Sequence, residues 1–559
     1  TLPDGQGYTM VLVDPQSNPD HNDPASWLPG DVVGGGPGQS DGTVSSGYLA
    51  WKSENNVGDD DDDDDGDSIT NFGEYGFGTL PDDAGAATGD PSAWYCPWAA
   101  AGALRDSAFN LASAVDVDAM ITLPNPSPTE DPDRREIQLR GPGARSMDVG
   151  AIARRGASPG VVEFDDGPAV STSAMWSEEL LTGDRCVVSV PKTWHLVGGI
   201  TAEGFQLELQ LFNPFAESAK VRVEAITEFG SSPLAGFENI DIPGRSWVTE
   251  DLSRVIPFLD NASFTVTSES GIVIPSLVLS NGTDEASWPG TGQSTTWDFP
   301  VTSVRGLVPT LVLSKTGSTG ATVAIDLFTP DGPLLDADGR LVSPLEPVRI
   351  NLADLAEPPF AVRVRSNVPV SAVIQAGPEG TFPSTDVVLP EDDDGVAADD
   401  DATSDEATSE DPDGEESTTE TTVADGETSQ DEDGGGEAEG DEPEEPVSYD
   451  GLAAMPGNAE TLERWLVPGL GIVPGADTSV WILNPTGEEA TVTLSPLGVS
   501  ADGPEKVLIP PGTYLEVPIA PLSETGNSGM LVEANVPVSV AVTIAGPQGV
   551  AFIGGVGIG

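Results

Sequence analysis

Apolar residues in the central part of the chain fall at every second position. The alternation is clear in four segments, residues 206–212, 220–226, 262–267 and 271–278. A period of two places successive side chains on opposite faces, as in a β-strand with one buried face. Turn-forming pairs such as Asn213-Pro214 and Pro243-Gly244 separate the segments. The pattern therefore predicts a mostly β protein built from short strands.

This strand pattern recurs along the chain. Residues 367–371 and 535–539 both read Asn-Val-Pro-Val-Ser, and each is followed by Ala-Gly-Pro-x-Gly. An opening strand recurs at 194–198, 305–309 and 465–469, and the Asn-Pro corner recurs at Asn484-Pro485. We expect tandem immunoglobulin-like β-sandwich repeats, each with room for about seven short strands. A β-propeller built from the same strands is the alternative.

The repeats and the segments between them give a domain plan. Three repeats are expected at 192–295, 303–389 and 464–559, and residues 83–191 form an irregular β region. Residues 391–447 contain no Lys, Arg or aromatic residue. Such a segment cannot bury enough apolar surface to offset its chain entropy. We therefore predict a disordered acidic linker over 390–460, or a long insertion in a loop.

The charge balance excludes several classes of function. The chain has 93 acidic against 22 basic residues and a net charge of −71. Phosphate backbones and anionic lipids repel such a polyanion, so we expect no nucleic-acid partner.

No run of about 18 apolar residues is present, so no transmembrane segment is predicted in this chain. The sequence starts at Thr1 rather than Met, and we expect that this is not the native start.

The N-terminal 41 residues contain one apolar run, Tyr8–Asp14, followed by Gly- and Pro-rich sequence. The run predicts a strand, and residues 22–41 are expected to be loop. The order of strand, Trp27 and Gly-Gly-x-Pro-Gly resembles the end of a bacterial lamin-tail-type domain. That resemblance implies a small sandwich of the kind found on secreted proteins.

A possible calcium loop lies in the next segment, residues 42–82. Calcium takes six to eight oxygen ligands, and a 12-residue loop of the EF-hand type supplies them from positions 1, 3, 5, 7, 9 and 12. Ser68 stands where that loop normally has Gly, and a solvated Asp run is the alternative reading. The segment resembles the calcium loops of thrombospondin type 3 and dockerin-like repeats. It predicts a Ca²⁺ site with the ligands Asp63, Asp65, Asp67, Ile69, Asn71 and Glu74.

The chain offers little catalytic machinery. It has two cysteines, Cys96 and Cys186, and two histidines, His21 and His195. An even cysteine count in an exported chain predicts one disulfide, which would stabilise the fold by about 3–4 kcal/mol, with two free buried thiols as the alternative. No Gly-x-Ser-x-Gly elbow, Walker loop or zinc spacing is present. We expect His195 to be a packed or an exposed strand residue rather than a catalytic one, and the protein not to be an enzyme.

The order of these features resembles a known family. A Cys-Pro element at Cys96, a second cysteine at Cys186 and the strand at 194–198 precede the Asn-Pro and Val-Pro-Val motifs. This layout is similar to an actinobacterial exported family, domain of unknown function 5719, over residues 92–559. The resemblance implies export and a disulfide, and it implies no enzyme activity.

Three functions compete. The leading hypothesis is a non-catalytic secreted or cell-envelope protein whose repeats act as spacers or interaction modules, with a cell-wall glycan or a surface protein as partner. The second is an adhesin or carbohydrate-binding module, which predicts an exposed aromatic platform. The third is a hydrolase-associated region at 83–190, which predicts a pocket beside Cys96 and Cys186 with a converging acid and base. The candidates for the platform are Trp247, Trp288, Trp297 and Trp481.

Overall fold

The computed structural model describes most of the chain after residue 92. The described residues are 8–12, 27–33, 93–98, 106–383 and 449–558, apart from gaps at 126–129, 153–157, 165–167, 179, 189–190, 216, 331, 345, 499–503 and 520–527. Nearly all regular elements are strands. The prediction of a mostly β fold with tandem β-sandwich repeats is confirmed.

Two short strands lie near the N-terminus. β1 (Tyr8–Leu12) is the strand that the apolar run predicts. β2 (Trp27–Val33) pairs with it antiparallel, with Leu12 opposite Trp27. The expectation that residues 27–33 are loop was wrong. A backbone partner decided this segment, whereas its Gly and Pro content suggested a turn.

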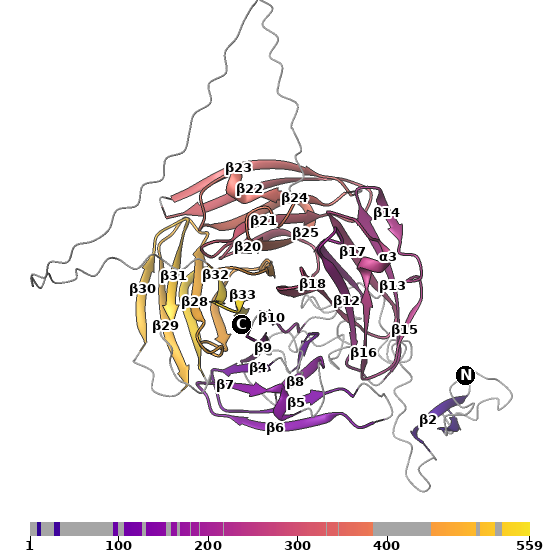
Figure 1. Ribbon diagram of the computed structural model, residues 1–559. Helices are drawn as coiled ribbons and strands as arrows, with labels where there is room; N and C mark the ends of the chain where they lie inside the picture. Colours follow the sequence, from indigo (N-terminus) through magenta and orange to yellow (C-terminus); the bar gives the residue numbers. More distant parts are fainter. Residues whose placement is uncertain are drawn as a thin grey trace, which may run out of the picture. The chain divides into compact units, whose positions relative to one another are not determined.

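Four β-sandwiches follow along the chain, each made of two sheets (Figure 1). The first contains β3 (Ala93–Cys96), β4 (Asp106–Ser113), β5 (Val117–Leu123), β6 (Asp133–Leu139), β7 (Gly143–Asp148), η3 (Val149–Ala151), β8 (Gly160–Phe164), β9 (Ala169–Trp176) and β10 (Leu181–Arg185). The second contains β11 (Thr193–Gly199), β12 (Gln206–Asn213), β13 (Ala219–Thr227), β14 (Gly230–Pro233), β15 (Ile240–Ile242), β16 (Ser246–Asp251), α3 (Leu252–Val255), β17 (Ala262–Ser270), β18 (Ile274–Ser280) and β19 (Glu285–Pro289).

The third and fourth sandwiches complete the series. The third contains β20 (Ser294–Phe299), β21 (Val308–Ser314), β22 (Ala321–Thr329), β23 (Gly332–Val342), β24 (Val348–Asn351), η4 (Leu352–Asp354), β25 (Ala361–Gly377) and β26 (Ala453–Pro456). The fourth contains β27 (Leu462–Pro468), β28 (Asp477–Asn484), β29 (Ala490–Gly498), β30 (Glu505–Ile509), β31 (Thr513–Ile519), β32 (Ser528–Gly546), β33 (Gly549–Gly554) and β34 (Val556–Gly557).

All four sandwiches share one strand order. In the first, one sheet runs β3-β8-β5-β6 and the other β10-β9-β4-β7. The second has the equivalent sheets β11-β17-β13, with β14 and β15 both on β13, and β16-β12-β18-β19. In the third and fourth, the single long strands β25 and β32 take part in both sheets. The region 83–191, which we expected to be irregular, therefore contains a further copy of the repeat. Its strands β4 and β9 are buried on both faces, so they lack the alternation that identifies half-buried strands.

The Val-Pro-Val motif marks the place where β25 and β32 pass from one sheet to the other. Proline has no N–H to donate, so it fits where the pairing changes. The preceding asparagine holds the neighbouring strand, because Asn367 Oδ1 accepts from the Thr322 backbone N–H at 2.8 Å. Asn535 Oδ1 does the same for Thr491 at 2.6 Å. The repeated sequence therefore corresponds to a repeated structural function.

The third sandwich begins earlier than the sequence suggested. Its first strand is β20, and residues 305–309 lie mostly outside any strand. Its last strand, β26, pairs with β25 after the acidic segment. The segment between residues 384 and 448 is therefore an insertion between two strands of one sandwich, the alternative that the sequence left open. Residues 384–448 themselves lie outside the described part of the chain.

The last strands of the four sandwiches meet and close a ring. β10 contacts β19 and β33, and β26 contacts the same two strands. Figure 1 shows the sandwiches following one another around this ring, with β10 and β33 near its centre. Apolar packing continues across the closure, since Leu466 and Val556 of the fourth sandwich belong to the core of the first. The first and last quarters of the described chain are thus held together by buried side chains.

The Asn-Pro corners are buried hydrogen-bonding centres. Asn484 is completely buried, and its Nδ2 donates to the carbonyl oxygens of Glu488, Ile509 and Pro510 at 2.7, 3.1 and 3.2 Å. Asn213 has the same role in the second sandwich, with Nδ2 donating to the Glu217 and Ile242 oxygens. These amides satisfy backbone groups where a strand leaves the sheet.

We expect Asn484→Ala to lower the free energy of unfolding by about 2–3 kcal/mol, because buried carbonyl oxygens lose their donor. Urea denaturation followed by tryptophan fluorescence measures this change. Glu489→Ala, at an exposed position of the same turn, is the matched control and should change the free energy by less than about 0.5 kcal/mol. Equal effects of the two substitutions would contradict the structural role of the corner.

Candidate functional site

A cavity of about 450 Å³ lies where the four sandwiches come together. Each sandwich contributes one tryptophan from its first strand, namely Trp94, Trp194, Trp297 and Trp465. The chain segments that follow β10, β19, β26 and β33 also line it. Because its walls come from all four sandwiches, this cavity depends on ring closure. We treat it as the candidate functional site and call it the axial cavity.

The four tryptophans occupy equivalent positions. Each stands opposite a valine of the neighbouring strand, and the pairs are Trp94 with Val162, Trp194 with Val266, Trp297 with Val364 and Trp465 with Val532. Only 2–3% of the surface of each is exposed. The tryptophans therefore form the wall of the axial cavity rather than an open aromatic surface.

The indole N–H groups differ between the sandwiches. Trp297 Nε1 donates to the Val370 oxygen at 2.8 Å, and Trp465 Nε1 donates to the Val538 oxygen at 3.1 Å. Both acceptors are the second valine of Val-Pro-Val, which gives that motif a second function. Trp94 Nε1 and Trp194 Nε1 are buried without a partner, so two donors in the cavity wall have unused hydrogen-bonding capacity.

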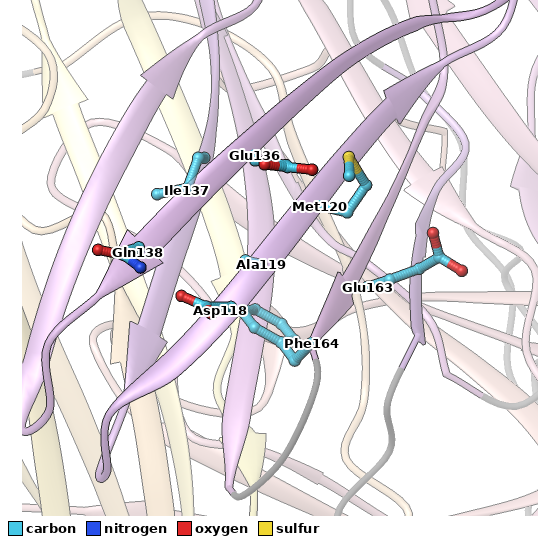
Figure 2. Close-up of a pocket in the computed structure, with 8 residues that line it drawn as sticks. All are labelled: Asp118, Ala119, Met120, Glu136, Ile137, Gln138, Glu163 and Phe164. Carbon is cyan, nitrogen blue, oxygen red and sulfur yellow. The ribbon is translucent and has the colours of Figure 1, made fainter.

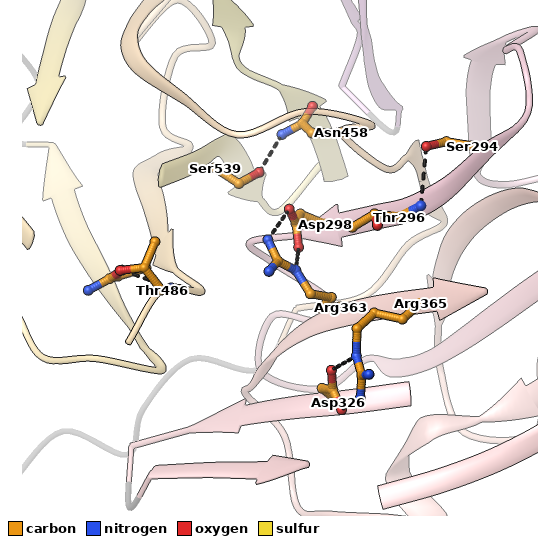
Figure 3. Close-up of polar contacts among 10 residues, drawn as sticks. Ser294, Thr296, Asp298, Asp326, Arg363, Arg365, Asn458, Thr486 and Ser539 are labelled. Atoms are coloured by element: carbon orange, nitrogen blue, oxygen red, sulfur yellow. Dashed lines mark hydrogen bonds and ion pairs between the residues drawn. The ribbon is translucent and has the colours of Figure 1, made fainter. Parts of the chain in front are cut away.

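Asn458 connects three sandwiches at the cavity (Figure 3). Its backbone exchanges hydrogen bonds with Asp298 of the third sandwich at 2.8 and 2.9 Å. Its Nδ2 donates to Ser539 Oγ at 2.8 Å in the fourth sandwich, as Figure 3 shows, and to the Val540 oxygen at 3.0 Å. Its Oδ1 accepts from Arg185 Nη1 of the first sandwich at 3.2 Å. One amide side chain therefore fixes the relative positions of the groups at the cavity.

Ion pairs with buried carboxylates support this side of the third sandwich. Arg363 binds Asp298 through two hydrogen bonds of 2.7 and 2.8 Å, and Arg365 binds Asp326 at 2.6 and 2.9 Å (Figure 3). Burial raises the pKa of Asp298, and the Arg363 guanidinium acts in the opposite direction. Two-point contacts of this kind fix geometry as well as charge. The Arg363–Asp298 pair holds β20, and with it Trp297, against β25, and the Arg365–Asp326 pair links β22 to β25.

Arg349 joins the second and third sandwiches. It is 1% exposed, and its guanidinium donates to Gln375 Oε1 at 2.8 Å and to the Gly198 oxygen at 2.9 Å. Desolvation lowers the pKa of this arginine to about 9, against a smaller opposing effect of Asp260. A buried cation held by neutral oxygens is a structural contact here, since its donors are directed at backbone and amide groups.

Among the described residues, the lining of the axial cavity contains no acid–base pair of the kind that hydrolysis requires. Its ionisable lining residues are Arg185 and Glu460, and Cys186 is in a disulfide. His195 is on β11, and its backbone pairs with Thr291, but its side chain is not part of the lining. Desolvation, with a smaller effect of Lys315, lowers the pKa of His195 to about 4. A histidine held neutral in this way fits the packed alternative that the sequence left open.

A second hollow, of about 670 Å³, lies on the sheet of β5, β6 and β8 (Figure 2). It carries three carboxylates, of Asp118, Glu136 and Glu163, on adjacent strands. Figure 2 shows Glu136 and Glu163 on either side of Met120, and all three acidic residues are exposed. Among the described residues, no group of three His, Cys, Asp or Glu side chains is placed to hold a metal ion. We therefore interpret this face as a solvated acidic surface.

The structure bears differently on the three other predicted sites, which are the disulfide, the calcium loop and the aromatic platform. The disulfide Cys96–Cys186 is present and links β3 to the residue after β10. The six predicted calcium ligands, residues 63–74, lie outside the described residues. The aromatic platform was wrong for three of its four candidates, because Trp288, Trp297 and Trp481 are buried. Trp247 is partly buried against the core of the second sandwich.

Sequence reasoning missed the axial cavity. The signal was present, since a tryptophan recurs in each first strand. The repeat was misplaced in the third sandwich, because the Leu-Val sequence at 307–308 resembles the opening strands of the other repeats. Trp297, which lies before it, was therefore not recognised as the equivalent tryptophan. Arg185 and Asn458 had no pattern to reveal them, because they belong to segments that meet only in the ring.

Removing the disulfide should destabilise the first sandwich. The half-cystines are 90 residues apart, so the loop-entropy model gives about 4–5 kcal/mol, somewhat more than the 3–4 kcal/mol expected from the sequence. We expect the double variant Cys96→Ala/Cys186→Ala to unfold at a lower temperature than the oxidised protein in calorimetry. Reductant should lower the midpoint of the wild type toward that of the variant and leave the variant unchanged. Equal midpoints for the oxidised wild type and the variant would contradict the prediction.

The depressed pKa of His195 predicts an acid-dependent loss of stability. The neutral form is favoured in the folded state, so protons bind the unfolded chain more strongly once the pH falls below about 6.5. At pH 5 the loss is up to about 2 kcal/mol relative to pH 7. Unfolding of wild type and His195→Gln at both pH values measures it, and the variant should lose less stability. The buried carboxyls of Asp184 and Asp298 are common to both proteins and cancel in the comparison. An identical pH response of the two proteins would show that His195 titrates normally.

Comparisons with known proteins agree with the sequence resemblance. No helix among the described residues is long and apolar enough to cross a membrane. No curated protein matches the chain. Residues 179–447 match the model of a family of unknown function, DUF5719. This stretch runs from the end of the first sandwich through the second and third sandwiches into the acidic insertion. The resemblance to DUF5719 that the sequence suggested is therefore confirmed over residues 179–447.

Proposed function

We propose that the chain is a non-catalytic extracellular or cell-envelope protein in which the ring of four sandwiches is an interaction module and the axial cavity is its binding site. The observation that carries the proposal is the convergence of four equivalent tryptophans on one cavity. Ligand sites in proteins are concave and mostly apolar, with volumes of about 300–1,000 Å³ and a few polar groups. The axial cavity has this composition and size.

Three further features support this function over catalysis. The described lining residues include the hydroxyl groups of Thr291 and Ser294 but no histidine and no free thiol, which favours binding over catalysis. The disulfide suits an oxidising compartment outside the cytoplasm. The surplus of acidic residues keeps the protein soluble and away from anionic surfaces. Calcium binding by residues 63–74 stays a prediction from the sequence.

A cell-wall glycan or a surface protein was the partner expected from the sequence. An extended glycan binds best on exposed aromatic rings, but three of the four candidate tryptophans are buried. The axial cavity favours a small ligand, or one end of a larger one, over a long chain. We therefore place the binding function in this cavity rather than on the outer sheets.

Binding of a neutral fluorescent probe, N-phenyl-1-naphthylamine, tests this site in the full chain. We expect saturable binding with energy transfer from tryptophan. Gly292 lines the cavity, has open space where a Cβ would stand and has no positive φ. Gly292→Phe should therefore fill the cavity and weaken binding at least about tenfold, by more than about 1.4 kcal/mol.

Gly487→Phe is the matched control, because Gly487 is exposed in a turn of the fourth sandwich with the same open space. It should leave probe binding unchanged. The proposed function fails if the wild type does not bind the probe, or if both glycine variants bind it equally well.

A further inference from the structure

The axial cavity contains a positive charge that no described carboxylate neutralises. Arg185 ends β10 and lines the cavity. Its guanidinium has one side-chain partner, Asn458 Oδ1, at 3.2 Å. Among the residues that the structure describes, no carboxylate lies within ion-pair distance of it. Asn458 is fixed in turn by Ser539 and Val540, so its amide oxygen is turned toward the arginine.

This unpaired arginine is unusual in a chain with 93 acidic and 22 basic residues. Two arginines of β25 have carboxylate partners, Arg363 with Asp298 and Arg365 with Asp326. A guanidinium taken out of water without a counter-ion is costly, and it favours any anion that reaches it. Desolvation lowers the pKa of Arg185, against a smaller opposing effect of Asp184.

The adjacent carboxyl group does not supply the counter-ion. Asp184 precedes Arg185 in β10, and successive strand residues point to opposite faces. Asp184 is buried beside Ser287 of the second sandwich, and burial raises its pKa well above the ordinary value. Its side chain is not part of the cavity lining.

The rest of the lining has surplus hydrogen-bond donors. The indole N–H groups of Trp94 and Trp194 and the Nε2 of Gln293 are buried without a partner, and all three residues line the cavity. These three nitrogen atoms have almost no accessible surface, so the charge of Arg185 decides the ligand class. An anionic oxygen group suits it, because such a group accepts several hydrogen bonds from a guanidinium and carries the missing charge.

We propose that the axial cavity binds a small monoanionic ligand with a planar apolar body, of the arylcarboxylate class. The anionic group binds Arg185, and the apolar body packs among the four tryptophans. This inference rests on the proposed function, because it names the ligand class of the same site. A volume of about 450 Å³ suits a compact molecule of this kind.

One acidic residue lies at the same cavity and opposes the anion. Glu460 lines the cavity and is exposed. Its charge repels an anionic ligand, more weakly than Arg185 attracts it, because an exposed charge is screened by water and salt. Removing this carboxylate should leave anion binding unchanged or strengthen it, whereas removing the Arg185 charge should weaken it. The two substitutions thus act in opposite directions on one measurement.

A pair of probes with the same aromatic frame tests the ligand class in the full chain. 1-Anilinonaphthalene-8-sulfonate carries one negative charge, and N-phenyl-1-naphthylamine carries none. We expect the wild type to bind the anionic probe at least about tenfold more tightly than the neutral one, which is a gap of about 1.4 kcal/mol. Arg185→Gln should remove most of this preference, Arg185→Lys should keep part of it, and Glu460→Gln should keep or increase it. Arg222→Gln, on an outer strand, should change neither affinity.

The ratio of the two affinities decides the outcome. Equal affinities in the wild type, or a preference for the anion that survives Arg185→Gln, would overturn the ligand class while leaving the proposed binding function standing. Failure of both probes to bind the wild type would overturn the proposed function itself. If Arg185→Gln abolishes binding of both probes by disturbing the cavity, the other two variants decide the outcome, because both preserve the packing. Arg185→Lys keeps the positive charge, and Glu460→Gln removes a negative one. Loss of the preference in Glu460→Gln would contradict the proposal.

Discussion

Closure of the ring is the constraint on which the rest of the structure depends. The last strands β10, β19, β26 and β33 contact one another in turn, and the fourth sandwich packs its apolar residues into the core of the first. Without that contact the four first strands would have no common centre. The buried apolar area across the closure supplies the driving force for ring formation. The hydrogen bonds of Asn458 to three sandwiches fix their relative orientation. Ring and cavity are therefore one structural unit.

The sequence motifs recur where the backbone of each sandwich needs the same hydrogen bond. Each asparagine of the Asn-Pro corners satisfies buried carbonyl groups where a strand leaves its sheet. Each asparagine of the Asn-Val-Pro-Val motifs holds the N–H of a neighbouring strand where the long strand changes sheets. Polar groups withdrawn from water must find partners, and the same local geometry requires the same side chain. This explains why a few polar residues recur although most of the sandwich surfaces differ.

The electrostatics of the protein divide into two parts. The outer sheets and the acidic segment contain most of the negative charge, and the carboxylates of Asp118, Glu136 and Glu163 are exposed to solvent. Inside the ring, charges are few and each has a defined geometry, as in the Arg363–Asp298 pair. An unpaired Arg185 stands out in this setting. Charge that would be screened on the surface acts strongly in a cavity with aromatic walls.

The sequence by itself determined the strands, the turns and much of the repeat, because these depend on side-chain periodicity and on local backbone chemistry. Alternating residues marked β12, β13 and β17, and the even cysteine count predicted the disulfide. It did not reveal the first sandwich, whose strands β4 and β9 are buried on both faces and show no alternation. Only the tertiary structure decided that four tryptophans, Arg185 and Asn458 share one cavity. Those residues are separated by up to several hundred positions, and a contact between the first and fourth sandwiches brings them together, which no local pattern records.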